Sequence, residues 1–154
     1  MGIGGFFMED NIINDKSLFN IELIQGVSVR GFKESDFSSI QNLYKEEGWM
    51  TFINRDKDSL ESWKNSSIAI VAVEGEQIVG LVRGFTDGNI TTFIAEIIVH
   101  RDYRGKGIGK ALLDICHQLY PKTRIELLAD EEVYEFYTRN KFRKIMGFRK
   151  SYEV

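Results

Sequence analysis

One stretch of the sequence, residues 92–119, constrains the fold more than any other. Its first part reads TFIAEIIVH and is rich in β-branched and aromatic residues, which is typical of a strand buried on both faces. A glycine-rich turn follows at residues 104–109. Beyond the turn, apolar residues recur at the spacing of an amphipathic helix, at Ile108, Ala111, Leu112, Ile115, Cys116 and Leu119.

The glycines of this turn lie where the predicted strand gives way to the predicted helix. Unpaired N–H groups and the positive end of the helix dipole favour an anion there, and glycines let it approach the backbone. The turn is not a Walker A loop, because Arg104 stands at the first glycine position and Ala111 at the Ser or Thr position. It is not a dinucleotide fingerprint either, because Lys110 and Leu112 occupy the positions of the third glycine. The sequence therefore predicts a phosphate-binding turn of another kind.

Two motifs resemble those of the GNAT superfamily of acyl-CoA N-acyltransferases, in particular its small members. The first is Arg-x-x-Gly-x-Gly within VHRDYRGKGIGKALL, and the second is FYTRNKF at residues 136–142. The resemblance implies that the turn binds the pyrophosphate of acetyl-CoA and that Tyr137 reaches its sulfur. The residues implied to contact acetyl-CoA are Ile97, Ile98, Val99, Arg104, Gly105, Lys106, Gly107, Ile108, Gly109, Lys110, Phe136 and Tyr137.

Two positions depart from the family pattern. Lys141 stands where the second motif usually has glycine, although Asn140 before it tolerates a left-handed turn. Asp130 stands near a position where the family often has an asparagine that bonds the pantetheine arm, and a carboxylate cannot donate that bond.

The rest of the chain predicts an α/β fold with a mixed sheet. Strands are expected at residues 27–32, 68–73, 78–85, 92–100 and 123–129, with one or two more within 142–154. Helices are expected at residues 36–47, 58–63, 108–119 and 131–140. A right-handed crossover makes strand 123–129 parallel to strand 92–100. This order matches a GNAT-like sheet of about six to seven strands flanked by about four helices, with the two parallel strands splayed apart at the centre.

The chain is predicted to form one acetyltransferase domain over residues 21–154, with residues 1–20 as a leader or an additional edge strand.

Transfer of an acetyl group to an amine sets three chemical requirements. The thioester oxygen gains negative charge and needs fixed donors, for which free backbone N–H groups near residues 97–99 are candidates. The leaving thiolate benefits from a proton, and Tyr137 is the candidate donor. The acceptor amine must lose a proton, and Glu96 and Glu126 are the candidate bases because each lies in an otherwise apolar strand. The alternative for either glutamate is a structural ion pair, with Arg83 as a partner for Glu96.

The resemblance also implies an acceptor-binding wall in the first helix-loop-helix region. Trp49 and Phe52 are the candidate residues, and plain core packing is the alternative for both. A primary amine of a small molecule is the predicted acceptor. A protein lysine or N-terminal acetyltransferase, and a non-catalytic coenzyme A sensor, stay open as alternatives.

The composition excludes several other classes of protein. A net charge of −3 and a pI near 5.5 argue against a nucleic-acid-binding face. The single cysteine, Cys116, lies on the apolar helix face and is predicted to be a core residue, and no Cys/His spacing suggests a metal site. No run has the length of a membrane span, and a cytoplasmic location is predicted. Exposed edge strands leave a homodimer open.

Overall fold

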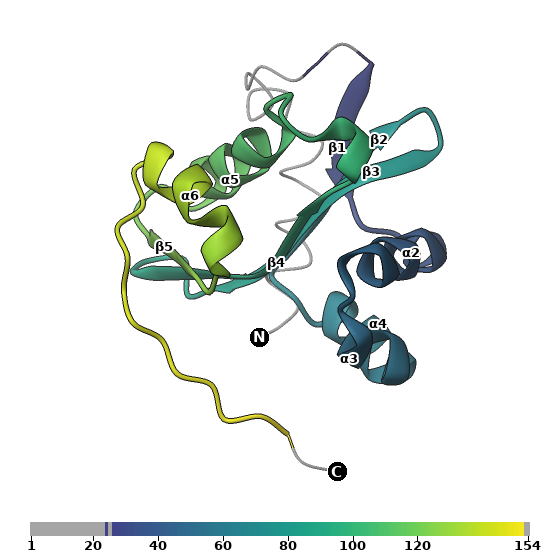
Figure 1. Cartoon of the computed structure of the whole chain (residues 1–154), viewed down its shortest axis with the longest axis horizontal. Helices are drawn as coiled ribbons and strands as arrows, with labels where there is room; N and C mark the ends of the chain where they lie inside the picture. The colour runs from purple at the N-terminus through teal and green to yellow at the C-terminus, as the bar shows by residue number, and fades with distance from the viewer. Residues whose placement is uncertain (1–23, 25, 153–154) are drawn as a thin grey trace.

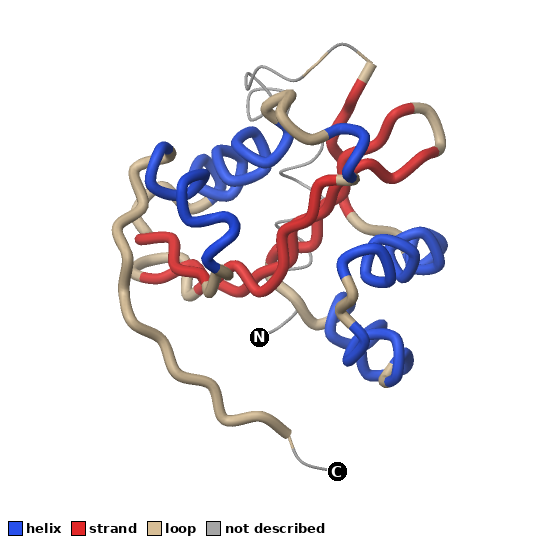
Figure 2. Tube along the Cα trace, in the orientation of Figure 1, coloured by secondary structure: helices blue, strands red, loops and turns tan. Residues whose placement is uncertain are grey.

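The computed structural model describes residue 24 and residues 26–152 of the chain. The leader or edge strand predicted within residues 1–20 lies outside the described residues. The described part consists of one mixed sheet with helices on both faces (Figures 1 and 2). No helix in this part is long and apolar enough to cross a membrane. Its His, Cys, Asp and Glu side chains form no group of three that could hold a metal ion.

The elements follow the predicted order up to the last helix. They are β1 (Val27–Gly31), α2 (Phe37–Glu47), α3 (Met50–Asn54), α4 (Asp56–Lys64), β2 (Ile68–Glu74), β3 (Gln77–Thr86), β4 (Thr91–Val99), α5 (Ile108–Leu119), β5 (Arg124–Leu127) and α6 (Tyr134–Arg139). Short 3₁₀ helices precede three of the helices: η2 (Glu34–Asp36), η3 (Arg101–Tyr103) and η4 (Glu131–Val133).

The sheet has five strands in the order β1-β2-β3-β4-β5. The pairs from β1 to β4 are antiparallel, and β5 is parallel to β4. Helix α5 makes the crossover between the two parallel strands, as the right-handed βαβ rule requires. The α/β class and the parallel pairing of β4 with β5 are therefore confirmed, but this pair lies at one edge of the five-stranded sheet and not at its centre, because no further strand pairs with β5 in the described residues.

Each face of the sheet carries its own apolar core. Helices α5 and α6 cover one face, and α2, α3 and α4 cover the other (Figure 1). Strand β2 serves both cores, because Ile70 and Ala72 pack toward α5 whereas Ala69 and Val71 pack toward α2. This explains why the strand reads as a continuous apolar run.

A β-bulge interrupts the pairing of β3 and β4 near the middle of the sheet. Arg83 lies opposite Glu96, but the next residue, Gly84, lies opposite Ile94, so Ala95 is the extra residue. As a result, Ile94 joins the core on the α5 side, while Glu96 points to the α2 side and bonds Tyr44 there. The bulge therefore decides which face receives the one acidic side chain of β4.

The predicted strand count of six to seven is too high for the described residues, which form five. The missing strand is the one expected from residue 142 onward, since residues 142–152 form no regular structure. Its apolar side chains are not buried against the sheet: Ile145, Met146 and Phe148 are 60%, 78% and 89% exposed. The short helix expected at residues 58–63 is present as α4, and α3 is an additional helix that was not predicted.

Gly84 is predicted to be essential for the bulge. A Cβ atom there would lie 2.5 Å from the carbonyl oxygen of Phe93, which is backbone and cannot move aside easily. We expect Gly84→Ala to lower the free energy of unfolding by about 1–3 kcal/mol in urea denaturation followed by circular dichroism. Glu76→Ala, at the exposed tip of the β2–β3 hairpin, is the control and should change stability by less than about 0.5 kcal/mol. Equal stability of the two variants would contradict the tight contact.

Candidate active site

The predicted phosphate-binding turn has the backbone conformation that its glycines allow. Gly105 and Gly107 have φ angles of +75° and +89°, and a Cβ atom at either position would meet nothing within 4 Å. Gly107 is the N-cap of α5, and the first intrahelical bond is donated by the Ala111 N–H to the Gly107 carbonyl at 3.0 Å. The N–H groups of residues 108–110 consequently have no partner within the helix. The turn that precedes them leaves open space at Gly105 and Gly107, as a bound diphosphate requires.

Gly109 serves a different purpose from the two turn glycines. It lies inside α5, and a Cβ atom there would be 3.3 Å from the Phe136 ring and 3.6 Å from the Val99 side chain. The absence of a side chain at Gly109 therefore lets α6 approach the start of α5 and the end of β4.

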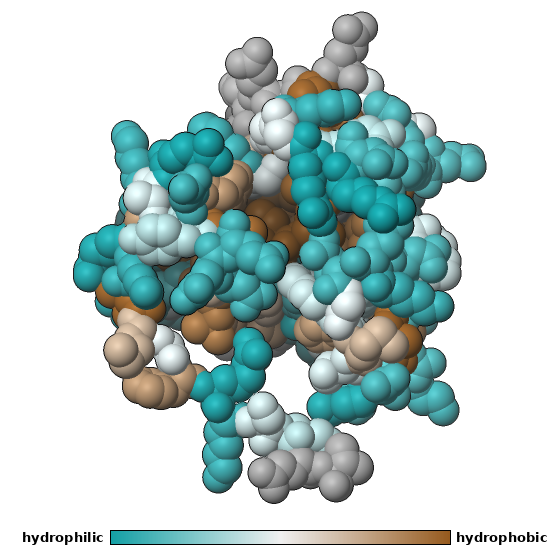
Figure 3. Space-filling model, viewed as in Figure 1, coloured by the Kyte–Doolittle hydropathy of each residue, from teal (hydrophilic) through white to brown (hydrophobic). Residues whose placement is uncertain are grey.

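Strands β4 and β5 part close to this turn. Their parallel pairing ends at Ile94 and Leu127, although β4 continues to Val99. The His100 N–H donates to the Val79 carbonyl at 2.8 Å, and antiparallel bonds alternate, so the Ile98 peptide group also faces β3. The peptide groups of Ile97 and Val99 then point away from β3, toward the gap that β5 leaves. Figure 3 shows a hollow with an apolar floor in this region, between α6 and the α2 side of the molecule.

Phe136 and Tyr137 of α6 lie on the α5 side of the gap and pack against that core. The Tyr137 ring makes edge-to-face contacts with Phe136 and Phe142, with centroids 5.1 and 5.4 Å apart. Burial raises the pKa of the Tyr137 phenol to about 12. Its hydroxyl bonds no other group in the described part of the chain, and so it is available to a ligand.

Glu96 lies in a buried polar network on the opposite face of β4. Its carboxylate accepts from Arg83 Nε at 2.5 Å and from the Tyr44 hydroxyl at 2.9 Å. Tyr44 in turn accepts from Trp63 Nε1 at 2.9 Å, and Arg83 donates to Ser66 Oγ at 3.1 Å. Burial raises the pKa of the Glu96 carboxyl against the opposing effect of Arg83, and burial beside Glu96 raises the pKa of Tyr44. The structural ion pair expected as one alternative for Glu96 is thus present.

Glu126 has very different surroundings. Its side chain is 43% exposed and pairs along the same strand with Arg124, at 2.8 Å between Oε1 and Nε. The structure therefore does not bring the two predicted bases together: Glu96 is enclosed beneath α2, and Glu126 lies at the sheet edge.

Trp49 and Phe52 form an aromatic layer over Tyr44. Phe52 stacks on the Tyr44 ring at 4.5 Å between centroids, and Trp49 lies 6.2 Å from it. Both residues are partly exposed, so each has one side in the core and one side open. Core packing accounts for the buried sides only, and the role of Trp49 and Phe52 in acceptor binding stays a prediction.

The cations of the turn already have partners. Arg104 donates from Nε to the Val99 carbonyl at 3.0 Å and forms an ion pair with Glu47, the last residue of α2. Lys110 pairs with Asp114 at 2.6 Å, and Lys106 lies 5.5 Å from the centre of the Tyr103 ring. Sequence reasoning missed the pair of Arg104 and Glu47, because nothing local links two residues 57 positions apart.

Cys116 lies on the inner face of α5 and is fully buried in the core, as predicted. Burial raises the pKa of its thiol to about 12, so the thiol stays protonated at neutral pH.

With this geometry in view, the comparisons with known proteins point in one direction. The family model of the acetyltransferase (GNAT) domain matches residues 65–144, just over half of the chain. The chain therefore belongs to the GNAT acetyltransferase family, and it is an acyl-CoA-dependent N-acetyltransferase. An uncharacterised N-acetyltransferase, Ycf52 of Pyropia yezoensis, is 28% identical over 144 residues, which cover 86% of this chain and 79% of that protein.

Solved structures share the fold at low sequence identity. A GNAT family acetyltransferase from Streptococcus pneumoniae superposes with a TM-score of 0.66 at 20% identity, covering 83% of this chain and 98% of its own. An aminoglycoside acetyltransferase from an uncultured soil metagenomic sample superposes with a TM-score of 0.67 at 20% identity, covering 86% of this chain and 100% of its own. The GNAT-like fold predicted from the two motifs is confirmed.

The surroundings of the two glutamates predict losses of stability of very different size. Removing the Glu96 carboxylate would leave the Arg83 charge buried and unpaired, so we expect Glu96→Ala to lower the free energy of unfolding by about 3–5 kcal/mol. Glu126→Ala removes an exposed pair and should cost at most about 1 kcal/mol. Urea denaturation of both variants measures the difference. A Glu96→Ala protein as stable as the Glu126→Ala protein would rule out a structural role for the buried pair.

Proposed function

We propose that this acetyltransferase transfers the acetyl group of acetyl-CoA to the primary amine of a small molecule, by direct attack in a ternary complex. The observation that carries the proposal is the gap that β5 leaves along the end of β4, where Val99 lies next to Gly109 at the end of the glycine turn. An extended thioester arm requires such a gap, and its diphosphate requires such a turn.

The residues present fit acetyl-CoA, which supplies the activated acyl group when it is bound. The N–H groups of residues 108–110 and the open space at Gly105 and Gly107 suit a diphosphate. The peptide N–H groups of Ile97 and Val99 face the gap and can donate to the thioester oxygen as it gains negative charge. The Ile98 peptide group faces β3, and its side chain belongs to the opposite core. The role of Ile98 is therefore structural.

Tyr137 is the proposed proton donor to the leaving thiolate. Because its pKa is raised to about 12, the phenol holds its proton throughout the neutral range. Its unpaired hydroxyl lies on α6, which lines the same side of the gap as the glycine turn. A general acid that is protonated before the reaction and free of other partners can act without a prior rearrangement.

The acceptor is proposed to bind on the open side of Trp49 and Phe52. An aromatic layer next to the sheet suits a small apolar or aromatic amine. One structural neighbour of this chain is an aminoglycoside acetyltransferase, whose acceptor is also a small molecule although a polar one. The base that removes the amine proton stays a prediction for Glu96 and Glu126. The Glu126 side chain is 43% exposed to solvent, whereas the Glu96 carboxylate is buried and bonded to both Arg83 and Tyr44. The cytoplasmic location likewise stays a prediction.

Gly107 offers a direct test of cofactor binding. We expect Gly107→Val to raise the Kd for coenzyme A at least about 100-fold in isothermal titration calorimetry, since a β-branched residue cannot keep the φ angle of +89° that shapes the turn. Gly88→Val is the matched control: it has a φ of +78° and equally open space, but it lies in the β3–β4 hairpin.

Both substitutions should cost similar stability, and only Gly107→Val should lose binding. Normal binding by a folded Gly107→Val protein would contradict the proposed cradle. Binding of coenzyme A without turnover of any amine in a broad panel would instead favour a sensor, and turnover of peptides alone would favour a protein acetyltransferase.

Replacement of Tyr137 tests the proton donor. We expect Tyr137→Phe to lower kcat about 10²–10³-fold with little change in the KM for acetyl-CoA, because the ring contacts remain and only the proton is lost. The wild-type rate should not fall through an ionisation of this phenol between pH 7 and pH 10, as its pKa is about 12. A fall with an apparent pKa near 10 that disappears in Tyr137→Phe would refute the assignment.

A further inference from the structure

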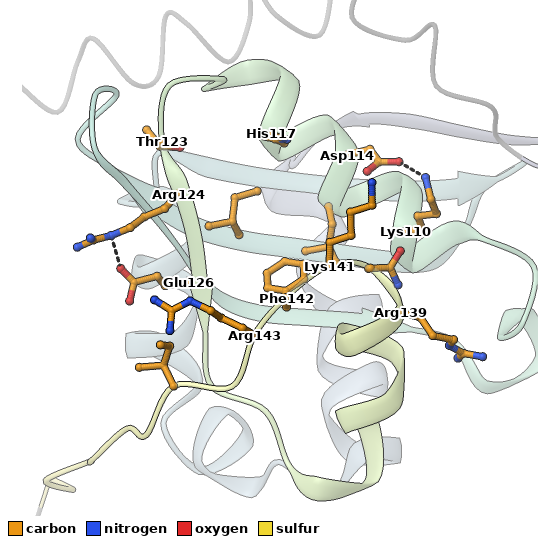
Figure 4. Close-up of a pocket in the computed structure, with 14 residues that line it drawn as sticks. Lys110, Asp114, His117, Thr123, Arg124, Glu126, Arg139, Lys141, Phe142 and Arg143 are labelled. Atoms are coloured by element: carbon orange, nitrogen blue, oxygen red, sulfur yellow. Dashed lines mark hydrogen bonds and ion pairs between the residues drawn. The ribbon is translucent and has the colours of Figure 1, made fainter.

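A second hollow lies beside β5, the edge strand of the sheet. It has a volume of about 870 Å³ and is bordered by α5, by β5 and by the chain that follows α6 (Figure 4). This is within the range of about 300–1,000 Å³ that is usual for small-molecule sites. We refer to it as the β5 pocket.

The β5 pocket is strongly basic. Five of its lining side chains are Lys or Arg and two are Asp or Glu, which leaves a net charge of +3 with His117 neutral. The whole chain has a net charge of −3, so the cations are concentrated at this place. Both acids are already paired, Asp114 with Lys110 and Glu126 with Arg124. Arg139, Lys141 and Arg143 form no ion pair with any residue that the structure describes.

Lys141 is the member of this group that calls for an explanation. Its φ is +68°, and no other non-glycine residue in the described part of the chain has a positive φ. A left-handed conformation costs a residue with a Cβ atom free energy, and the related motif has glycine at this position. The backbone around it is nevertheless fixed, since the Lys141 N–H donates to Thr138 and the Phe142 N–H to Tyr137, at 3.1 and 3.0 Å. Figure 4 shows the Lys141 side chain extending toward Lys110 and Asp114 of α5.

The β5 pocket reaches the first turn of the helix whose N-terminus is proposed to hold the diphosphate. Lys110, the third residue of α5, lies in the first turn of that helix and also lines the pocket. A diphosphate held at this helix N-terminus, with its thioester arm in the gap, would carry its adenosine away from the gap. A basic pocket that begins at Lys110 is then within reach of the adenosine and its charged groups.

We infer that Lys141, together with Lys110, binds the 3′-phosphate on the adenosine of acetyl-CoA and makes this enzyme selective for it over cofactors that lack that phosphate. The inference rests on the proposed function. A phosphate monoester is the ligand that a hollow with a net charge of +3 recognises best, through charge-assisted hydrogen bonds, and the unpaired Lys141 ammonium can supply them beside Lys110, which is paired with Asp114. No covalent step is involved.

Binding of coenzyme A and of 3′-dephospho-coenzyme A, measured by titration calorimetry in 50 mM salt, tests the inference. We expect the wild-type chain to bind coenzyme A about tenfold more tightly, and Lys141→Gly to reduce this ratio to about twofold. Glycine suits the φ of +68°, so this variant keeps the turn and should not be less stable than the wild type. Lys144→Gly is the matched control, because it removes a cation three residues further on that does not line the pocket, and it should keep the tenfold ratio.

The outcomes separate the inference from the function on which it rests. Equal affinity of the wild type for both cofactors overturns the inference and leaves the proposed function intact. A tenfold ratio that survives in Lys141→Gly, or that is lost equally in Lys144→Gly, also overturns it. Failure of the wild type to bind either cofactor overturns the proposed function itself.

Discussion

The early end of the parallel pairing between β4 and β5 is the constraint on which the rest of the site depends. Pairing stops at Ile94 and Leu127, so the last residues of β4 keep peptide groups that no strand satisfies. Such groups are costly inside a protein unless water or a ligand bonds them. A chain that leaves them open beside a positively polarised helix end therefore has a ready place for an extended, anionic ligand, and the other elements border that place.

The β-bulge at Ala95 links this gap to the opposite core. It turns Glu96 toward α2, where Arg83, Tyr44 and Trp63 complete a buried network. The same Tyr44 ring carries Phe52 and Trp49 on its outer side. The aromatic layer proposed to bind the acceptor is thus held to β4 by polar contacts with defined directions, and not by apolar packing alone. A pair of this kind gives geometry more than stability.

Much of this could be predicted from the sequence where the signal is local. The run of residues 92–119 predicted a strand, a turn and a helix, and all three are present, because periodicity and glycine placement report directly on backbone conformation. The strand expected beyond residue 142 did not form, since a strand depends on a partner that no local pattern specifies. For the same reason sequence reasoning missed two contacts: the ion pair of Arg104 with Glu47, and the hydrogen bond that the Tyr44 hydroxyl donates to Glu96. Glu96 and Glu126 each lie among apolar residues in their strands, which suggested equal burial of the two carboxylates. Only the tertiary structure shows that Glu96 is enclosed and that Glu126 lies at the sheet edge.

The burial of Cys116 has a practical consequence for work on this enzyme. The chain has a single cysteine, and its thiol is enclosed in the core with a pKa of about 12. Reagents that detect free sulfhydryls require an accessible thiolate, so they should not react with the folded protein. Released coenzyme A can then be followed continuously in a colorimetric assay with no background from the catalyst. The appearance of a protein signal in the same assay would report unfolding.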